Sequence, residues 1–355
     1  MARLSGVSVS TVSRVFNGYA DVSDATRQRV IESARELDYA PSAAARTLVK
    51  RRSQLIGVVL STGLEHPDIE HPFFQGVLVG LKHAIGSLGY DLLLFATDQP
   101  GSNRGRPHSY LRRARHHHVD GVVLMGVDRD DPELEKLLSS QTPIVAVDLD
   151  VAGLRASYVS SDNLGGSRLA MRHLHGLGHT RIATITGRQE TKAGSDRLLG
   201  YRAEVQALGL EVPPEYEQHG DFYSESGEAA MRAFLELDEP PTAVFAAADL
   251  MAVGAIRALE EAGLRCPDDV AVVGFDDINL AELVTPALTT IRQDALGIGT
   301  AAGRSLVEMI EDPEVVPPAR MLPVKLIVRD SCGAGSAPRK APRTRRTRAA
   351  KKEVK

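Results

Sequence analysis

Small hydroxyl side chains and one arginine gather near the start of the chain, at a spacing that suits hydrogen bonding to nucleic acid. Val12, Val15 and Phe16 recur at helical spacing and predict the buried side of a short helix over residues 9–16. The opposite side carries Ser8, Val9, Ser10, Ser13 and Arg14. Small side chains let a helix enter the major groove of DNA deeply, and arginine reaches a guanine edge or a phosphate. An ordinary helical surface domain fits the same periodicity.

Serine residues mark where the helices of this segment begin. Ser8 and Ser23 each precede a helical pattern and can cap it through the side-chain hydroxyl. The buried stripe of the second helix is expected to comprise Val30, Ala34 and Leu37. The first 41 residues are therefore predicted to form a small helical module.

From residue 55 the pattern changes to alternating strands and helices. Residues 55–60 form a continuous apolar run, which is typical of a strand buried on both faces. Further strands are expected at 90–95, 121–125, 143–147, 182–185, 243–246 and 270–274. Helices are expected at 74–87, 168–177, 196–208 and 251–262. This alternation predicts parallel sheets covered by helices, and the number of strands favours two α/β subdomains.

Residues that follow strands are the candidates for ligand binding, because ligands of open α/β sheets bind beyond the carboxyl ends of the strands. The aromatic candidates are Phe73, Phe74 and Phe222, whose flat faces could stack on a sugar ring or a purine, or could simply pack in the core. Asp276 follows the strand at 270–274. Met125 and Asp148 end earlier strands and are weaker candidates.

No residue pattern indicates catalysis, a metal or a cofactor. His116, His117 and His118 are consecutive, so they cannot all face one ion, and a solvated helix end explains them better. The segment Gly297-Ile298-Gly299 has the wrong spacing for a dinucleotide loop. Because neither a nucleophile elbow nor paired catalytic carboxylates stand at strand ends, we expect no enzyme activity.

Composition and charge narrow the class of protein further. The 355 residues suggest two or three domains, and no apolar run approaches the roughly 20 residues of a membrane helix. The two cysteines fit a reducing cytosol. Residues 1–53 hold nine Lys and Arg against five Asp and Glu, and residues 333–355 hold nine against one, although the net charge is −4. The two terminal segments are therefore basic and the residues between them are acidic. This distribution is typical of a protein that binds a polyanion at one end.

An ordered series of short motifs over roughly residues 1–330 resembles the LacI/GalR family of transcriptional repressors. The motifs are Gly6-Val7-Ser8, Thr11-Val12-Ser13-Arg14-Val15, Val22-Ser23, Leu37-Asp38-Tyr39-Ala40-Pro41, Ala45-Arg46-Thr47-Leu48, His71-Pro72-Phe73-Phe74, Arg197 with Gly200-Tyr201, Asp249-Leu250-Met251-Ala252, and Val273-Gly274-Phe275-Asp276-Asp277. The first helix of the family usually begins several residues earlier, so we expect the sequence to be truncated at its N-terminus.

The resemblance implies an α/β fold, with a helix-turn-helix DNA-binding domain joined to a periplasmic-binding-protein-like effector domain of two α/β subdomains. The DNA-binding domain would be residues 1–41, and residues 42–53 would be a hinge helix or linker. The ligand-binding domain would be residues 54–330, with lobe 1 at 54–156 and 288–316 and lobe 2 at 157–287 and 317–330. Residues 331–355 would be a disordered basic tail.

The resemblance also implies which residues bind. The DNA-binding residues would be Ser8, Val9, Ser10, Thr11, Ser13, Arg14, Asn17, Arg46 and Leu48. Leu48 matches the apolar wedge that kinks a central base step, although a plain linker with an incidental leucine is the alternative. The effector-binding residues would be Phe73, Phe74, Arg197, Phe222, Asp249 and Asp276. Arg197 and Asp249 would together hold ligand hydroxyls, since one donates and the other accepts. Ala248 stands where the family often has Asn, which leaves the exact sugar open.

These features predict a dimeric repressor that binds operator DNA and is controlled by a small molecule, most simply a carbohydrate, between the two lobes. A purine or nucleoside effector is the main alternative. A sugar-binding protein without DNA binding is a further one, but it would need no DNA-reading module. We expect a cytoplasmic, nucleoid-associated protein without a membrane partner.

Overall fold

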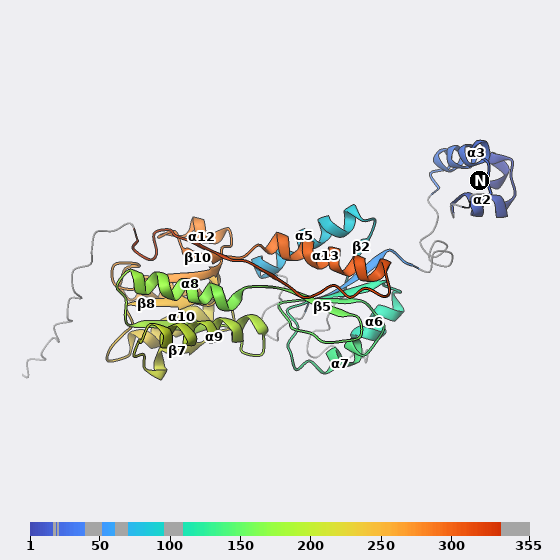
Figure 1. Cartoon of the computed structure of the whole chain (residues 1–355). Coiled ribbons are helices and arrows are strands. Elements are labelled where there is room, and N and C mark those ends of the chain that lie inside the picture. The colour runs from blue at the N-terminus through green and yellow to red at the C-terminus, as the bar shows by residue number, and fades with distance from the viewer. Residues whose placement is uncertain (17–18, 20, 40–51, 61–69, 96–108, 335–355) are drawn as a thin grey trace, which may run out of the picture. The chain divides into compact units, whose positions relative to one another are not determined.

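The computed structural model describes residues 1–334 except 17–18, 20, 40–51, 61–69 and 96–108. It divides into two compact units (Figure 1). The first contains Met1–Val159 and Ile298–Ala319, and the second contains Ser160–Gly297 and the residues from Arg320 onward. Among the described residues, no helix has the length and apolar character needed to cross a membrane.

Three helices form the amino-terminal module, namely α1 (Ala2–Ser5), α2 (Val9–Phe16) and α3 (Asp24–Glu36). Ser8 Oγ accepts a hydrogen bond from the Thr11 N–H at 3.1 Å, and Ser23 Oγ accepts one from the Thr26 N–H at 3.4 Å, as their positions predict. Val30 and Ala34 are buried. The expectation for Leu37 is wrong, because it caps the end of α3 and is 50% exposed.

A six-stranded sheet has the order β11-β5-β4-β3-β1-β2, and apart from β11 and the end of β5 its strands belong to the first unit. Its strands are β1 (Leu55–Leu60), β2 (Asp91–Phe95), β3 (Gly121–Met125), β4 (Ile144–Val147), β5 (Ala156–Ser161) and β11 (Arg320–Leu322). Besides α1, α2 and α3, the helices of this unit are α5 (Pro72–Ser87), α6 (Tyr110–His116), α7 (Pro132–Leu138) and, from Ile298 onward, α13 (Ala295–Glu311). β1 pairs in parallel with β2 and β3, so the central strands are apolar on both faces.

A second six-stranded sheet has the order β12-β10-β9-β8-β6-β7. Its strands are β6 (Ile182–Thr186), β7 (Glu217–His219), β8 (Ala243–Ala246), β9 (Ala271–Asp276), β10 (Thr289–Arg292) and β12 (Lys325–Ile327). The accompanying helices are α8 (Asn163–Gly176), α9 (Lys192–Ala207), α10 (Ser224–Leu235), α11 (Asp249–Glu261), α12 (Leu280–Leu283) and the 3-10 turn η2 (Pro214–Tyr216). α8 and α9 share one buried cluster with the sheet (Figure 1), and α10 and α11 share the other.

Two expected boundaries differ from the structure, and a third cannot be compared with it. Lobe 1 does not resume near residue 288, because β10 pairs with β9 and keeps residues up to Gly297 in the second unit. The tail does not begin at residue 331, since Ser331 and Cys332 are buried in that unit. Of the expected hinge, residues 42–51 lie outside the described residues, while Arg52 Nη2 donates to the Ile310 carbonyl of α13 at 3.0 Å.

The crossing of α5 and α13 depends on a glycine. A Cβ built on Gly299 would lie 1.9 Å from the Val77 carbonyl oxygen, whereas a Cβ on Gly86 of α5 meets nothing within 4 Å. We therefore expect Gly299→Ala to lower the free energy of unfolding by about 2 kcal/mol or more, through overpacking. Gly86→Ala should raise it by up to about 1 kcal/mol, because alanine favours a helix. Thermal unfolding of both variants checks this, and equal shifts in Tm would contradict it.

Candidate nucleic-acid interface and effector site

One side of α2 is exposed, and it carries the residues that the spacing assigned to DNA contact. Val9 is 76% exposed, and Ser10, Ser13 and Arg14 are also exposed, whereas Val15 is buried on the other side. Arg14 Nη1 lies 3.0 Å from Asp21 Oδ2, and both side chains are more than half exposed. An exposed pair of this kind contributes little stability, so it leaves Arg14 available to a phosphate or a base.

The remaining DNA-binding candidates are only partly covered by the structure. Ser8 and Thr11 lie at the start of α2 and are hydrogen-bonded to each other, with 2.9 Å between their side-chain oxygens. Asn17, Arg46 and Leu48 lie outside the described residues. Their roles therefore stay predictions.

In the second unit, a buried guanidinium stands at the carboxyl ends of the strands. Arg197 of α9 is 3% exposed. Its Nε donates to Asn163 Oδ1 at 2.8 Å, and its Nη1 donates to the Ala247 carbonyl just after β8. The guanidinium carbon lies 3.8 Å from the centre of the Phe275 ring and 5.8 Å from that of Phe222. Each contact replaces part of the hydration that this cation loses on burial.

The ion-pair partner of Arg197 is Asp276, at the end of β9. Arg197 Nη1 lies 3.5 Å from Asp276 Oδ1, and the same oxygen accepts a hydrogen bond from Gln293 Nε2 at 2.6 Å. Gln293 follows β10 and is 5% exposed, and its own Oε1 is buried with no hydrogen-bond partner among the residues that the structure describes. Gln293 was not among the predicted site residues, because β10 was not predicted, and the end of that strand is the signal that would locate this residue.

Asp249 is buried nearby, and both of its carboxyl oxygens meet groups of the protein. Its side chain is 0% exposed, Oδ2 accepts the Ile278 N–H at 2.9 Å, and Oδ1 accepts the hydroxyl of Thr290. Burial first, and then the negative charge of Asp276, raise the pKa of Asp249 well above its ordinary value, although the two hydrogen bonds oppose the rise. This geometry makes Asp249 a support for the turn after β9.

The aromatic candidates fall in both units. Phe222 has a φ of 78° and is half-buried, and its ring fills the space that a side chain at Gly187 would need. Phe73 and Phe74 lie in the first turn of α5, with 5.4 Å between their ring centres. Phe73 is only 6% exposed. The second unit thus brings Phe222, Arg197, Asp249 and Asp276 together, while the two phenylalanines of α5 belong to the first unit.

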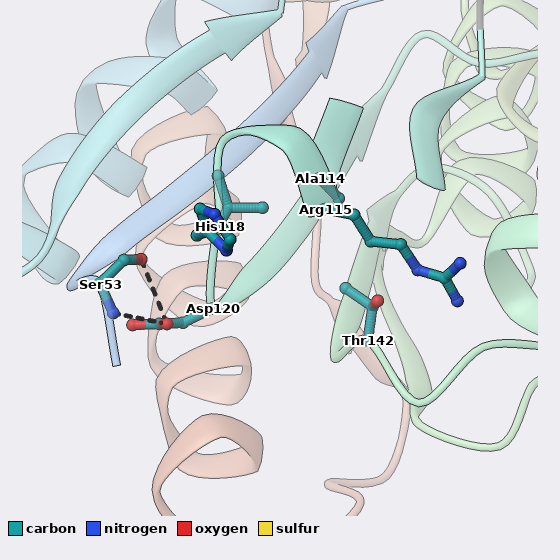
Figure 2. A pocket seen from close by; sticks show the side chains of 7 residues that line it. Ser53, Ala114, Arg115, His118, Asp120 and Thr142 are labelled. Carbon is teal, nitrogen blue, oxygen red and sulfur yellow. Dashed lines mark hydrogen bonds between the residues drawn. The ribbon is translucent and has the colours of Figure 1, made fainter. Parts of the chain in front are cut away.

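The first sheet has a pocket at its amino-terminal edge, where β1 begins (Figure 2). Asp120 Oδ1 accepts the Ser53 N–H at 2.8 Å, and Oδ2 accepts the Gln54 N–H at 2.8 Å. His118 and Arg115 also line it. Because α/β sheets bind ligands at the carboxyl edge, we assign this pocket a structural role in fixing the entry of the chain into β1.

The histidine tract lies at the end of α6. The rings of His116 and His117 stand 4.8 Å apart, edge to face, and all three histidines are exposed. Burial, followed by the nearby His116 and Arg113, lowers the pKa of His117. Across the part of the chain that the structure describes, no group of three His, Cys, Asp or Glu side chains is placed to hold a metal ion.

The raised pKa of Asp249 predicts a pH dependence of stability. The folded protein keeps this proton at pH values where the unfolded chain has released it, so stability is full below the ordinary value of 3.8 and falls as the pH rises toward the folded-state pKa. Asp249→Asn does not titrate, and it can keep both contacts if its amide oxygen accepts the Ile278 N–H and its amide N–H donates to the Thr290 hydroxyl, which reverses the second bond. The difference in free energy of unfolding, variant minus unmodified protein, should therefore increase as the pH rises above about 4. Thermal unfolding from pH 4 to 8 measures this, and a difference independent of pH would refute it.

Two family models match the chain. The model of bacterial regulatory proteins of the lacI family matches residues 1–42, and the model of a periplasmic binding protein-like domain matches residues 171–332. The first match covers α1, α2 and α3, and the second covers most of the second unit together with α13.

Full-length relatives match both parts of the chain at once. The HTH-type transcriptional regulator CelR of Thermobifida fusca is 41% identical over 333 residues, which is 93% of this chain and 96% of that protein. A solved structure of a CelR–cellobiose complex is 38% identical, with a TM-score of 0.70, and the match covers 93% of this chain and 98% of the other. A lac repressor dimer bound to operator and the anti-inducer ONPF is 28% identical, with a TM-score of 0.79, over 93% and 97% of the two chains.

The helical module, the two α/β units and the full-length similarity lead to one assignment. The predicted helix-turn-helix and effector folds are confirmed by the two family models and by the similarity to the lac repressor. The chain therefore belongs to the lacI family of bacterial regulatory proteins, and it is a DNA-binding transcriptional regulator rather than an enzyme.

Proposed function

We propose that this regulator is a repressor whose effector is a carbohydrate held by the cluster around Arg197. The observation that carries this proposal is a buried cation at the carboxyl ends of β8 and β9, stacked on one aromatic ring and near another. Sugar hydroxyls need both donors and acceptors, which Arg197 and Asp276 supply. Phe222 offers an aromatic ring of the kind that packs on a sugar face.

Cellobiose is the first sugar to test, because it is the ligand named for the CelR structure. The unused Oε1 of Gln293 adds an acceptor suited to a hydroxyl donor. A purine would use the same aromatic ring, and it remains the alternative effector. We assign Asp249 to the support of the cluster, and a ligand role for Phe73 and Phe74 stays a prediction.

For DNA, we propose that α2 reads base edges with its exposed side, while Asn17, Arg46 and Leu48 add contacts beyond it. An intercalating leucine of this kind would kink the operator between two half-sites. Two half-sites imply two copies of the chain. The similarity to a lac repressor dimer bound to operator supports a homodimer. Operator binding would place the protein in the cytoplasm at the nucleoid.

The effector site is tested by Arg197→Ala. Removing the guanidinium leaves Asp276 buried without its cation, so cellobiose affinity should fall at least a hundredfold while operator binding without sugar is kept. Isothermal titration and fluorescence anisotropy give the two affinities, and circular dichroism with Tm shows that the variant folds. Arg197→Lys keeps the charge and separates loss of ligand contact from loss of fold.

Arg202→Ala is the matched control on the same helix, because Arg202 is 59% exposed and pairs with Glu217 at the surface. It should bind cellobiose like the unmodified protein. If Arg197→Ala and Arg202→Ala bound the sugar equally well, the assignment of this cluster to the effector would be wrong.

The DNA-reading side of α2 is tested by Val9→Glu. A carboxylate at this exposed position would face the phosphates, so affinity for a duplex selected from a random library should fall at least a hundredfold. Gln28→Glu adds the same charge to the exposed surface of α3 and should change affinity less than threefold. Equal losses in the two variants would indicate general charge repulsion and would contradict a specific role for α2.

A further inference from the structure

The turn after β9 has an unusual backbone. Asp276 has a φ of 120° and Asp277 a φ of 60°, so two consecutive residues with side chains occupy the left-handed half of φ space. Residues other than glycine disfavour this conformation. Such backbone persists only where surrounding contacts hold it in place, and it concentrates at functional sites.

Each of three successive residues in this turn is held by a separate contact. Asp276 meets Arg197 and Gln293, as described above. The Ile278 N–H donates to the buried carboxylate of Asp249. Asp277, between them, is 5% exposed in its side chain and forms ion pairs with two arginines, Arg292 and Arg329.

Arg329, just beyond β12, is the more buried of these two arginines. Its side chain is 12% exposed, against 49% for that of Arg292. Arg329 Nη2 lies 2.7 Å from Asp277 Oδ1, and Nη1 donates to the Leu288 carbonyl at 2.8 Å. Its main-chain N–H donates to Thr289 Oγ1 at 2.8 Å, so the residue is fixed at both backbone and side chain.

Arg329 Nη2 also lies 2.9 Å from Glu282 of α12, but that carboxylate is 66% exposed. Solvent screens such a pair, whereas little solvent reaches the contact with Asp277. The contact with Asp277 is therefore the less screened of the two, and it is a charge contact rather than a hydrogen bond, since the hydrogen bond of Nη2 goes to Glu282. Arg292 Nε donates to the other oxygen of Asp277, from a more exposed position.

We propose that Arg329 is a positioning residue for the effector site. Through Asp277 it keeps the turn in the left-handed conformation that aims the carboxylate of Asp276 at Arg197 and at the bound ligand. The inference rests on the proposed function and extends it. Arg329 lies outside the ligand cluster and yet controls the affinity for the effector. Arg329 acts on the ligand indirectly, through the backbone of the adjacent residues Asp277 and Asp276.

The experiment compares Arg329→Gln and Arg329→Lys with the control Arg257→Gln, whose arginine is 68% exposed and pairs with Glu261 on α11. Cellobiose affinity is measured by titration calorimetry on the full chain. Amide hydrogen exchange is measured without ligand on peptides that contain residues 276–279. Arg329→Gln should weaken cellobiose binding about tenfold and speed exchange in this turn, with the rest of the second unit unchanged.

For Arg329→Lys, the cellobiose affinity and the exchange rate at residues 276–279 should both lie between those of the glutamine variant and the unmodified protein. Lysine keeps the charge but lacks the forked guanidinium geometry. Arg257→Gln should change neither quantity. Unchanged exchange at residues 276–279 in Arg329→Gln would overturn the proposal. Faster exchange with unaltered cellobiose affinity would overturn it too, since Arg329 would then stabilise the fold without positioning the site.

A second variant guards against loss of folding in Arg329→Gln. Asp277→Asn removes the charge that Arg329 holds and should give the same local change in exchange and affinity. In the double variant the two effects should not add, because both act through one contact. Full additivity would contradict the proposal. If the unmodified protein failed to bind cellobiose, the sugar assignment would fall, while the exchange measurement would still decide whether Arg329 holds the turn.

Discussion

Burial of one guanidinium organises the effector half of this protein. Arg197 has lost almost all contact with water, and a cation in that position is stable only where charge and hydrogen-bond acceptors replace the lost hydration. The ends of β8 and β9 supply these partners through the Ala247 carbonyl and Asp276. The parallel sheet matters for function because it delivers polar groups from separate strands to one edge.

The acidic partner needs support of its own, and this explains the polar residues behind it. Asp249 and Arg329 hold neighbouring parts of the turn that carries Asp276, one by a hydrogen bond to the Ile278 N–H and the other by an ion pair with Asp277. Asp249, which follows a strand, is predicted from the sequence as a ligand contact, whereas Arg329 has no sequence signal of its own. Their role in the turn follows only from which atoms they meet.

The sequence predicts the strands with continuous apolar runs well and the strands rich in Ser and Thr poorly. Residues 55–60, 121–125 and 243–246 are continuous apolar runs, and the structure has β1, β3 and β8 at those bounds. β5 and β10 are rich in Ser and Thr and lack such a run, so both were missed. Leu37 shows the same limit in a helix, because periodicity extends a stripe beyond the residue at which the helix ends. The pairing of Arg197 with Asp276 depends on tertiary geometry that no spacing encodes.

The central claim is that sugar and operator bind to one protein whose two sites are energetically coupled. The most direct measurement is the affinity for a library-selected duplex with and without saturating cellobiose, together with the affinity for cellobiose with and without that duplex. If the sites are coupled, cellobiose changes the duplex affinity by some factor, and the duplex changes the cellobiose affinity by the same factor, typically about 5- to 150-fold. Tight cellobiose binding that left duplex affinity unchanged would contradict the account.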